Sequence, residues 1–67
     1  MNKYVVMLTS DSHHLMNEPY FYFKGYEVEA NNLSEVDSMI EKLQRQFSLE
    51  FKVFLSEVQH LWTCKIK

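Results

Sequence analysis

One amphipathic segment limits what this chain can fold into, because only residues Asn32 to Phe47 carry apolar side chains at helical spacing. These residues recur at steps of three and four and predict one apolar stripe, consisting of Leu33, Val36, Met39, Ile40, Leu43 and Phe47. Asn32 with Glu35, or Ser34 with Asp37, would cap the start of the helix. Apolar side chains elsewhere must pack on this stripe or be covered in another way.

The segments before the helix read as two strands joined by a loop. Lys3 to Thr9 is apolar on both parities, as in a strand covered on both faces. Ser10 to Pro19 is polar and ends in proline, which predicts a loop. A second strand over Tyr20 to Ala30 contains the chain's single glycine.

That glycine interrupts the alternation of the second strand. A one-residue bulge at Lys24-Gly25 would gather the apolar residues on one face and leave Glu27 and Glu29 outside. The face so formed consists of Phe21, Phe23, Tyr26, Val28 and Ala30. A tight turn at Lys24-Gly25, which would split the segment into two short strands, is the alternative.

After Phe47 the apolar pattern changes to period two. Phe51, Val53 and Leu55 alternate with a second set, and so do Trp62, Cys64 and Ile66, which predicts two more strands, over residues 51–55 and 62–66. The second sets are Glu50, Lys52, Phe54 and Ser56, and Leu61, Thr63, Lys65 and Lys67. The connection between the two strands falls within Ser56 to His60, where a short helical turn is also possible. The predicted fold is therefore a single α+β domain over residues 1–67 in the order β-β-α-β-β, a small antiparallel sheet of about four strands with one amphipathic helix packed on one face.

A chain of 67 residues buries only about 60% of its extended surface, so association would add needed stability. Cys64 has no second cysteine to pair with, which fits a reducing compartment, and we expect a cytoplasmic protein. No apolar run approaches the roughly 20 residues of a membrane span, and no signal-peptide segment follows Lys3.

One helix can cover only one face of the predicted sheet. If Phe21, Phe23, Val53 and Trp62 meet the helix, the other face exposes an aromatic patch, which usually marks a partner surface. The predicted partner-binding residues are Tyr20, Tyr22, Phe54 and Leu61, with His13 and His14 in the adjoining loop. Alternatively, the loop Ser10 to Pro19 folds across this face through Leu15 and Met16.

No motif predicts catalysis, a metal or a cofactor. His13, His14, His60 and Cys64 lack the spacing of a zinc site, and Cys64 on an alternating apolar face is typical of packing. Glu27 and Glu29 are expected to form a solvated acidic edge. With one glycine, no phosphate-binding loop is possible.

The charge balance disfavours nucleic acid as a partner, because the net charge is -2. The sequence thus predicts a non-enzymatic protein–protein interaction module, a small regulator or inhibitor of the phage or mobile-element kind. It would bind a larger protein or homodimerise, with no membrane and no small-molecule substrate involved. The alternative is a single-stranded nucleic-acid-binding protein, whose stacking platform would combine Tyr20, Tyr22 and Phe54 with Lys24, Lys52 and Lys65.

Overall fold

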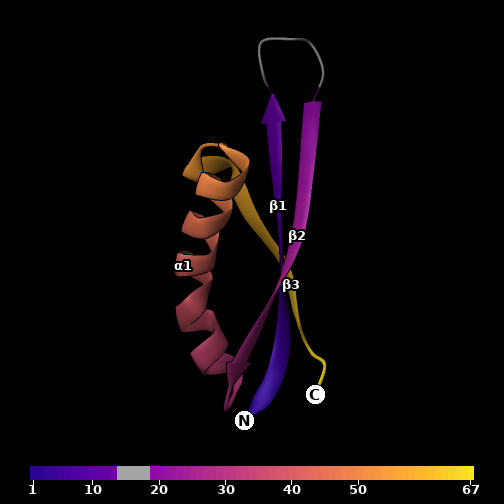
Figure 1. The fold of residues 1–67 in the computed structure, drawn as a ribbon, viewed down its shortest axis with the longest axis vertical. Coiled ribbons are helices and arrows are strands. Elements are labelled where there is room, and N and C mark those ends of the chain that lie inside the picture. Colours follow the sequence, from indigo (N-terminus) through magenta and orange to yellow (C-terminus); the bar gives the residue numbers. More distant parts are fainter. Residues whose placement is uncertain (14–18) are drawn as a thin grey trace.

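The computed structural model describes the backbone of residues 1–13 and 19–67 and the side chains of residues 1–10 and 22–67. Within these residues, three antiparallel strands form one sheet and one helix lies along a face of it (Figure 1). The elements in chain order are β1 (Asn2–His13), β2 (Pro19–Ala30), α1 (Leu33–Phe51), the 3-10 helix η1 (Leu55–Glu57) and β3 (Val58–Lys65). The strand order is β2-β1-β3, so β1 is central.

The α+β class with a single helix on an antiparallel sheet is confirmed, but the predicted strand over residues 51–55 is wrong. The helix α1 continues to Phe51, and η1 begins at Leu55. Phe51 follows Phe47 by four residues, so it extends the apolar stripe as readily as it starts an alternating strand. The helix ends because Lys52 adopts a left-handed conformation at φ 56°, and its N–H donates to Ser48 O.

The start of α1 agrees with the sequence. The Asn32 side chain accepts a hydrogen bond from the Glu35 N–H at 3.0 Å, as an N-cap should. The Glu35 carboxylate in turn accepts from the Asn31 N–H. These bonds satisfy backbone donors that have no partner within the helix.

The hairpin strands are longer than predicted. The strand β1 continues to His13 and β2 begins at Pro19, so residues 10–13 and Pro19 of the predicted loop belong to strands, and residues 14–18 lie outside the described part of the chain. The far ends of both strands extend past the end of α1 (Figure 1). Leu15 and Met16, which would cover the second sheet face in the alternative prediction, lie outside the described residues.

The predicted bulge at Lys24-Gly25 is wrong, and so is the alternative turn. The two strands pair without interruption from Asn2 opposite Ala30 to His13 opposite Pro19. A Cβ on Gly25 would lie 3.2 Å from Val5 Cγ1 and 3.4 Å from Met7 Cε. The glycine therefore makes room for two neighbouring side chains rather than for a change of direction.

An irregularity occurs in β3 instead. Met7 pairs with Trp62, but Leu8 pairs with His60. Leu61 is the extra residue of this bulge. The side chains on the two sides of Leu61 therefore follow different alternation along β3.

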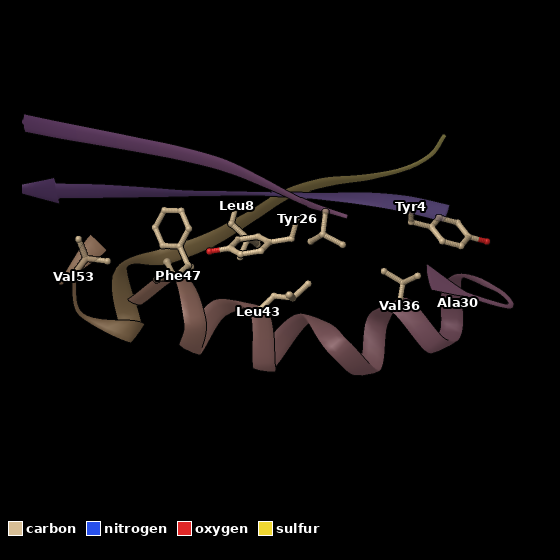
Figure 2. Packing of buried hydrophobic residues seen from close by; sticks show 10 residues of the cluster. Tyr4, Leu8, Tyr26, Ala30, Val36, Leu43, Phe47 and Val53 are labelled. Atoms are coloured by element: carbon tan, nitrogen blue, oxygen red, sulfur yellow. The ribbon is translucent and has the colours of Figure 1, made fainter. Parts of the chain in front are cut away.

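The core lies between α1 and the sheet (Figure 2). Buried side chains from β1 and β2 meet a buried stripe on the helix, and two valines close the end near η1. These residues are Tyr4, Val6 and Leu8 of β1, Tyr26 and Ala30 of β2, Val36, Leu43 and Phe47 of α1, and Val53 and Val58. Phe47 has no exposed surface and packs against the Phe51 ring, with 4.5 Å between their centroids. The helix thus covers one face of the sheet.

Candidate interaction surface

The face of the sheet turned away from α1 has no other described element packed on it (Figure 1). Opposite residues of an antiparallel pair project to the same side. Met7 lies opposite both Gly25 and Trp62, and Val5 lies opposite Cys64. Thr9, on the same side, lies opposite Phe23 and Gln59. The open face, as we call it below, is this side of the sheet, and its apolar part consists of Val5, Met7, Phe23, Gly25, Trp62 and Cys64.

Large apolar side chains are exposed on the open face. Phe23 retains 62% of its accessible surface and Trp62 retains 46%. Cys64 is exposed as well, whereas Val5 and Met7 are half-buried between the outer strands. Contiguous apolar surface of this kind on a protein commonly marks an interaction site.

An acidic border runs along the β2 side of the open face. Glu27 lies opposite Val5, and Glu29 lies opposite Lys3, so both carboxylates project to the same side as Phe23. Both glutamates are exposed. The open face therefore combines an apolar centre with a negatively charged margin, on which Lys3 is the cation opposite Glu29.

The predicted partner-binding residues are distributed over several parts of the molecule. Tyr22 lies on the helix side, where its ring is 5.1 Å from Phe51. Phe54 is 72% exposed on the connection between α1 and η1, and Leu61 is 46% exposed at the β3 bulge. Tyr20 and His13 belong to strands, but their side chains, like all of His14, lie outside what the structure describes.

Sequence reasoning missed Phe23 and Trp62 as exposed residues. The bulge expected at Lys24-Gly25 puts Phe23 on the helix side, whereas Trp62 is placed there without a pairing register to fix its parity. A straight β2 places Phe23 on the face of Glu27 and Glu29, and this reading was available from strict alternation. The expectation that the single helix covers one face agrees with the structure, and loop cover of the other face through Leu15 and Met16 lies outside the described residues.

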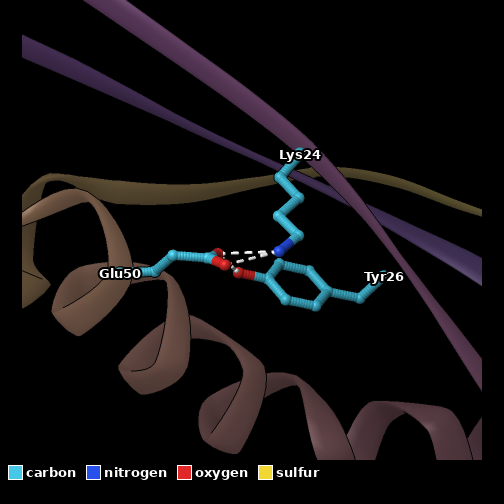
Figure 3. Close-up of polar contacts among 3 residues, drawn as sticks. All are labelled: Lys24, Tyr26 and Glu50. Atoms are coloured by element: carbon cyan, nitrogen blue, oxygen red, sulfur yellow. Dashed lines mark hydrogen bonds and ion pairs between the residues drawn. The ribbon is translucent and has the colours of Figure 1, made fainter.

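A polar contact on the opposite side ties α1 to β2 (Figure 3). The Lys24 Nζ donates to the two carboxylate oxygens of Glu50 at 2.6 and 2.9 Å, and the Tyr26 hydroxyl donates to Glu50 Oε2 at 3.0 Å. The hydrogen bonds from Lys24 and Tyr26 lower the pKa of Glu50. Burial, together with the Glu50 carboxylate, raises the pKa of Tyr26 from 10.0 to about 12. Lys24 is thereby engaged on the helix side of the sheet.

His60 and Cys64 do not converge. His60 Nε2 lies 2.8 Å from Thr63 Oγ1, and Thr63 pairs with the buried Val6 on the helix side. Cys64 pairs with Val5 and belongs to the open face. Across the part of the chain that the structure describes, no three His, Cys, Asp or Glu side chains are grouped so as to hold a metal ion.

A hollow of about 270 Å³ lies near the end of α1 and is lined by Arg45, Ser48, Leu49 and Leu55. Its polar side chains already have partners. Arg45 is paired with Glu41 at 2.8 Å, and Ser48 Oγ donates to Val53 O at 2.6 Å. The lining therefore offers an apolar depression without a free reactive group.

No protein-family model matches this chain, and neither the curated proteins nor the solved structures contain a match to it. Within residues 1–13 and 19–67, no helix has both the length and the apolar content needed to cross a membrane.

Proposed function

We propose that this protein is a non-enzymatic interaction module that binds another protein, or a second copy of itself, through the open face. The observation that carries the proposal is the exposure of Phe23 and Trp62 on a sheet face that no described element covers. Water contact with this apolar surface is unfavourable, and a partner would remove it. The role we infer is that of a small cytoplasmic regulator or inhibitor, of the kind that phages and mobile elements encode.

The residue types on the open face suit a protein partner. Trp, Phe and Met are enriched at the centres of protein interfaces, whereas charged residues are concentrated at their rims. Phe23, Met7 and Trp62 lie on the open face, and Glu27 and Glu29 lie along its margin. This distribution matches an apolar centre with a polar rim.

The area of the open face indicates a small contact. Seven residues of β1, Tyr4 to Ser10, are flanked by strands on both sides. Three strands about 4.8 Å apart and roughly 23 Å long give a projected area of roughly 300 Å². A standard interface buries about 800 Å² on each partner. A partner is therefore expected to contact a neighbouring edge of the sheet as well.

The arrangement of charges favours protein over single-stranded nucleic acid. Of the three lysines of the predicted stacking platform, Lys24 is engaged by Glu50, and Lys65 lies opposite the buried Tyr4. Two glutamates border the exposed Phe23 instead. Phosphates would be repelled at this margin, since nucleic-acid binding depends on clustered cations.

Matched serine substitutions test the proposal. Phe23 and Phe54 have similar exposure, 62% and 72%, but only Phe23 lies on the open face. Tagged wild-type protein, Phe23→Ser and Phe54→Ser would be compared for retained partners from native cells and for light-scattering mass at two concentrations and two salt levels. Far-ultraviolet circular dichroism would check that both variants fold.

We expect wild type and Phe54→Ser to hold the same partner or to share the same dimer mass, and Phe23→Ser to lose it. Retention by Phe23→Ser together with loss by Phe54→Ser would move the site to the connection between α1 and η1. Co-purifying nucleic acid whose binding weakens steeply with salt would favour the nucleic-acid alternative.

A further inference from the structure

The outer edge of β2 presents backbone groups that the sheet does not use. Lys3 N–H donates to Lys67 O, and Lys3 O accepts from Ile66 N–H, so the backbone of Lys3 faces the β3 side. Backbone groups alternate in direction along an antiparallel strand. Tyr4, Val6 and Leu8 therefore bond to β2, through the residues opposite them.

The backbone groups of β2 alternate in direction in the same way. Its even-numbered residues bond to β1, since Tyr4 pairs with Val28 and Val6 with Tyr26. The N–H and C=O groups of the odd-numbered residues consequently point away from the sheet. These residues are Phe23, Gly25, Glu27 and Glu29, and all four are exposed. Among the described residues, no backbone hydrogen bond outside the β1 ladder uses them.

The two edges of the sheet differ in how they are protected from pairing. The strand β3 has 8 residues and contains the bulge at Leu61, and short or bulged strands resist pairing with another chain. The strand β2 has 12 residues, pairs without a bulge, and has its one proline at its first position. The lysine within it, Lys24, points to the helix side and bonds to Glu50. Among the side chains of β2 that the structure describes, Glu27 and Glu29 are the charged residues that disfavour pairing at this edge.

The charges along β2 select the occupant. A strand added to the edge places its side chains opposite Phe23, Gly25, Glu27 and Glu29, and opposite charges in such pairs stabilise the pairing. The odd positions of β2 from Pro19 to Glu29 contain no lysine or arginine. Two β2 edges thus cannot give either glutamate an opposite charge, whereas a foreign basic strand can.

We propose that the free edge of β2 binds an extended segment of a partner protein by adding it to the sheet as a fourth strand. The segment carries basic side chains opposite Glu27 and Glu29 and a bulky apolar side chain beside Phe23. Main-chain hydrogen bonds hold such a strand, and its alternate side chains give specificity. The inference rests on the proposed function, because the added strand widens the open face and supplies the contact area that it lacks.

A synthetic peptide tests the edge directly. The probe is a capped, fluorescein-labelled peptide in which threonines alternate with two lysines, a valine and a phenylalanine. Their order is chosen so that, in antiparallel pairing, the lysines lie opposite Glu29 and Glu27, the valine opposite Gly25 and the phenylalanine opposite Phe23. One analogue is N-methylated at the lysines and valine, whose N–H groups would face β2. The matched control is N-methylated at the intervening threonines. Binding to the full chain would be followed by fluorescence anisotropy.

We expect saturable binding that the first N-methylation weakens by at least about tenfold and the control N-methylation leaves nearly unchanged. Charge reversal of Glu27 and Glu29 to lysine should weaken binding by more than about 2- to 30-fold, because two attractive pairs are lost and two like-charge pairs replace them, and a peptide with glutamates in place of lysines should restore it. No saturable binding would mean that the glutamates keep the edge unpaired, which overturns the inference.

Two further results would overturn the inference and leave the proposed function standing. Equal binding by both N-methylated analogues, with loss in Phe23→Ser, would place the peptide on the open face instead of the edge. A wild-type dimer that cannot bind the peptide, together with peptide binding by a monomeric variant, would make a second copy the occupant of the edge. Binding to the edge that survives Phe23→Ser would instead separate the edge from the open face and support the inference alone.

Discussion

Replacing Lys52 with glycine should stabilise the protein, although glycine usually weakens regular structure. Lys52 ends α1 in the left-handed region, at φ 56° and ψ 45°. A side chain in that region costs roughly 1–2 kcal/mol, whereas glycine adopts it freely. Glycine also gains about 0.5–1 kcal/mol of entropy in the unfolded chain, which offsets part of the benefit. The expected net effect is a gain of about 0.5–1 kcal/mol in the free energy of unfolding.

Urea unfolding followed by far-ultraviolet circular dichroism measures this change, and thermal unfolding should show a Tm higher by about 2–8 °C. Lys42→Gly is the matched control, because Lys42 is exposed in the interior of the same helix. There glycine should destabilise the protein by about 1 kcal/mol. The two variants replace the same residue with opposite expected signs.

The sign for Lys52→Gly separates two structures for this region. If residues 51–55 formed a strand, as their alternation suggests, glycine at position 52 would destabilise the protein. A loss of stability in Lys52→Gly comparable with that in Lys42→Gly would therefore refute the left-handed end of α1. It would also favour a fourth strand over residues 51–55.

Three further outcomes are expected. Phe47→Ala should lower the free energy of unfolding by about 3–5 kcal/mol, because Phe47 is fully buried. Leu49→Ala removes a side chain that is 81% exposed and should change this free energy little. Equal effects of the two substitutions in urea unfolding would contradict the core described above. The pKa of Tyr26 is raised from 10.0 to about 12, so the stability that this raised pKa contributes is complete below pH 10 and is lost as the pH rises towards 12. In a titration followed by ultraviolet absorbance, the ionisation step at the highest pH should therefore be missing in Tyr26→Phe. The pKa of Glu50 is lowered from 4.5, so the stability contributed by its carboxylate is present above that pH and is lost as the pH falls below it. Glu50→Gln should therefore lose less stability on acidification than wild type. An unchanged acid dependence would count against the contact with Lys24.

The sequence predicted the helix and its start because several local signals agreed there. The apolar stripe, the Asn32 cap and Glu35 three residues later all depend on neighbours in the chain, so no tertiary information was needed. The end of the helix had no such signal. Phe51 fits both periods, and the residue in the left-handed position is a lysine, where glycine would have marked the helix end.

The parity of β2 failed for a different reason. The bulge was assumed because Phe23 and the two glutamates seemed incompatible on one face. They are compatible when that face meets solvent or a partner, since an exposed phenylalanine needs no cover within the monomer. The idea that one helix leaves one sheet face open came from counting elements, whereas the residues on that face depended on register, which is set by the pairing with β1.

Photo-cross-linking tests the central claim most directly, because it captures whatever molecule contacts the open face in cells. Trp62 would be replaced by p-benzoylphenylalanine in the full chain, with the same replacement at Phe54 as the matched control. We expect irradiation of native cells to give one dominant adduct from position 62, with the mass of a partner or of a second copy, and none of that mass from position 54. An adduct from position 54 alone, or no adduct from position 62 in folded protein, would contradict the assignment of the open face as the interaction surface.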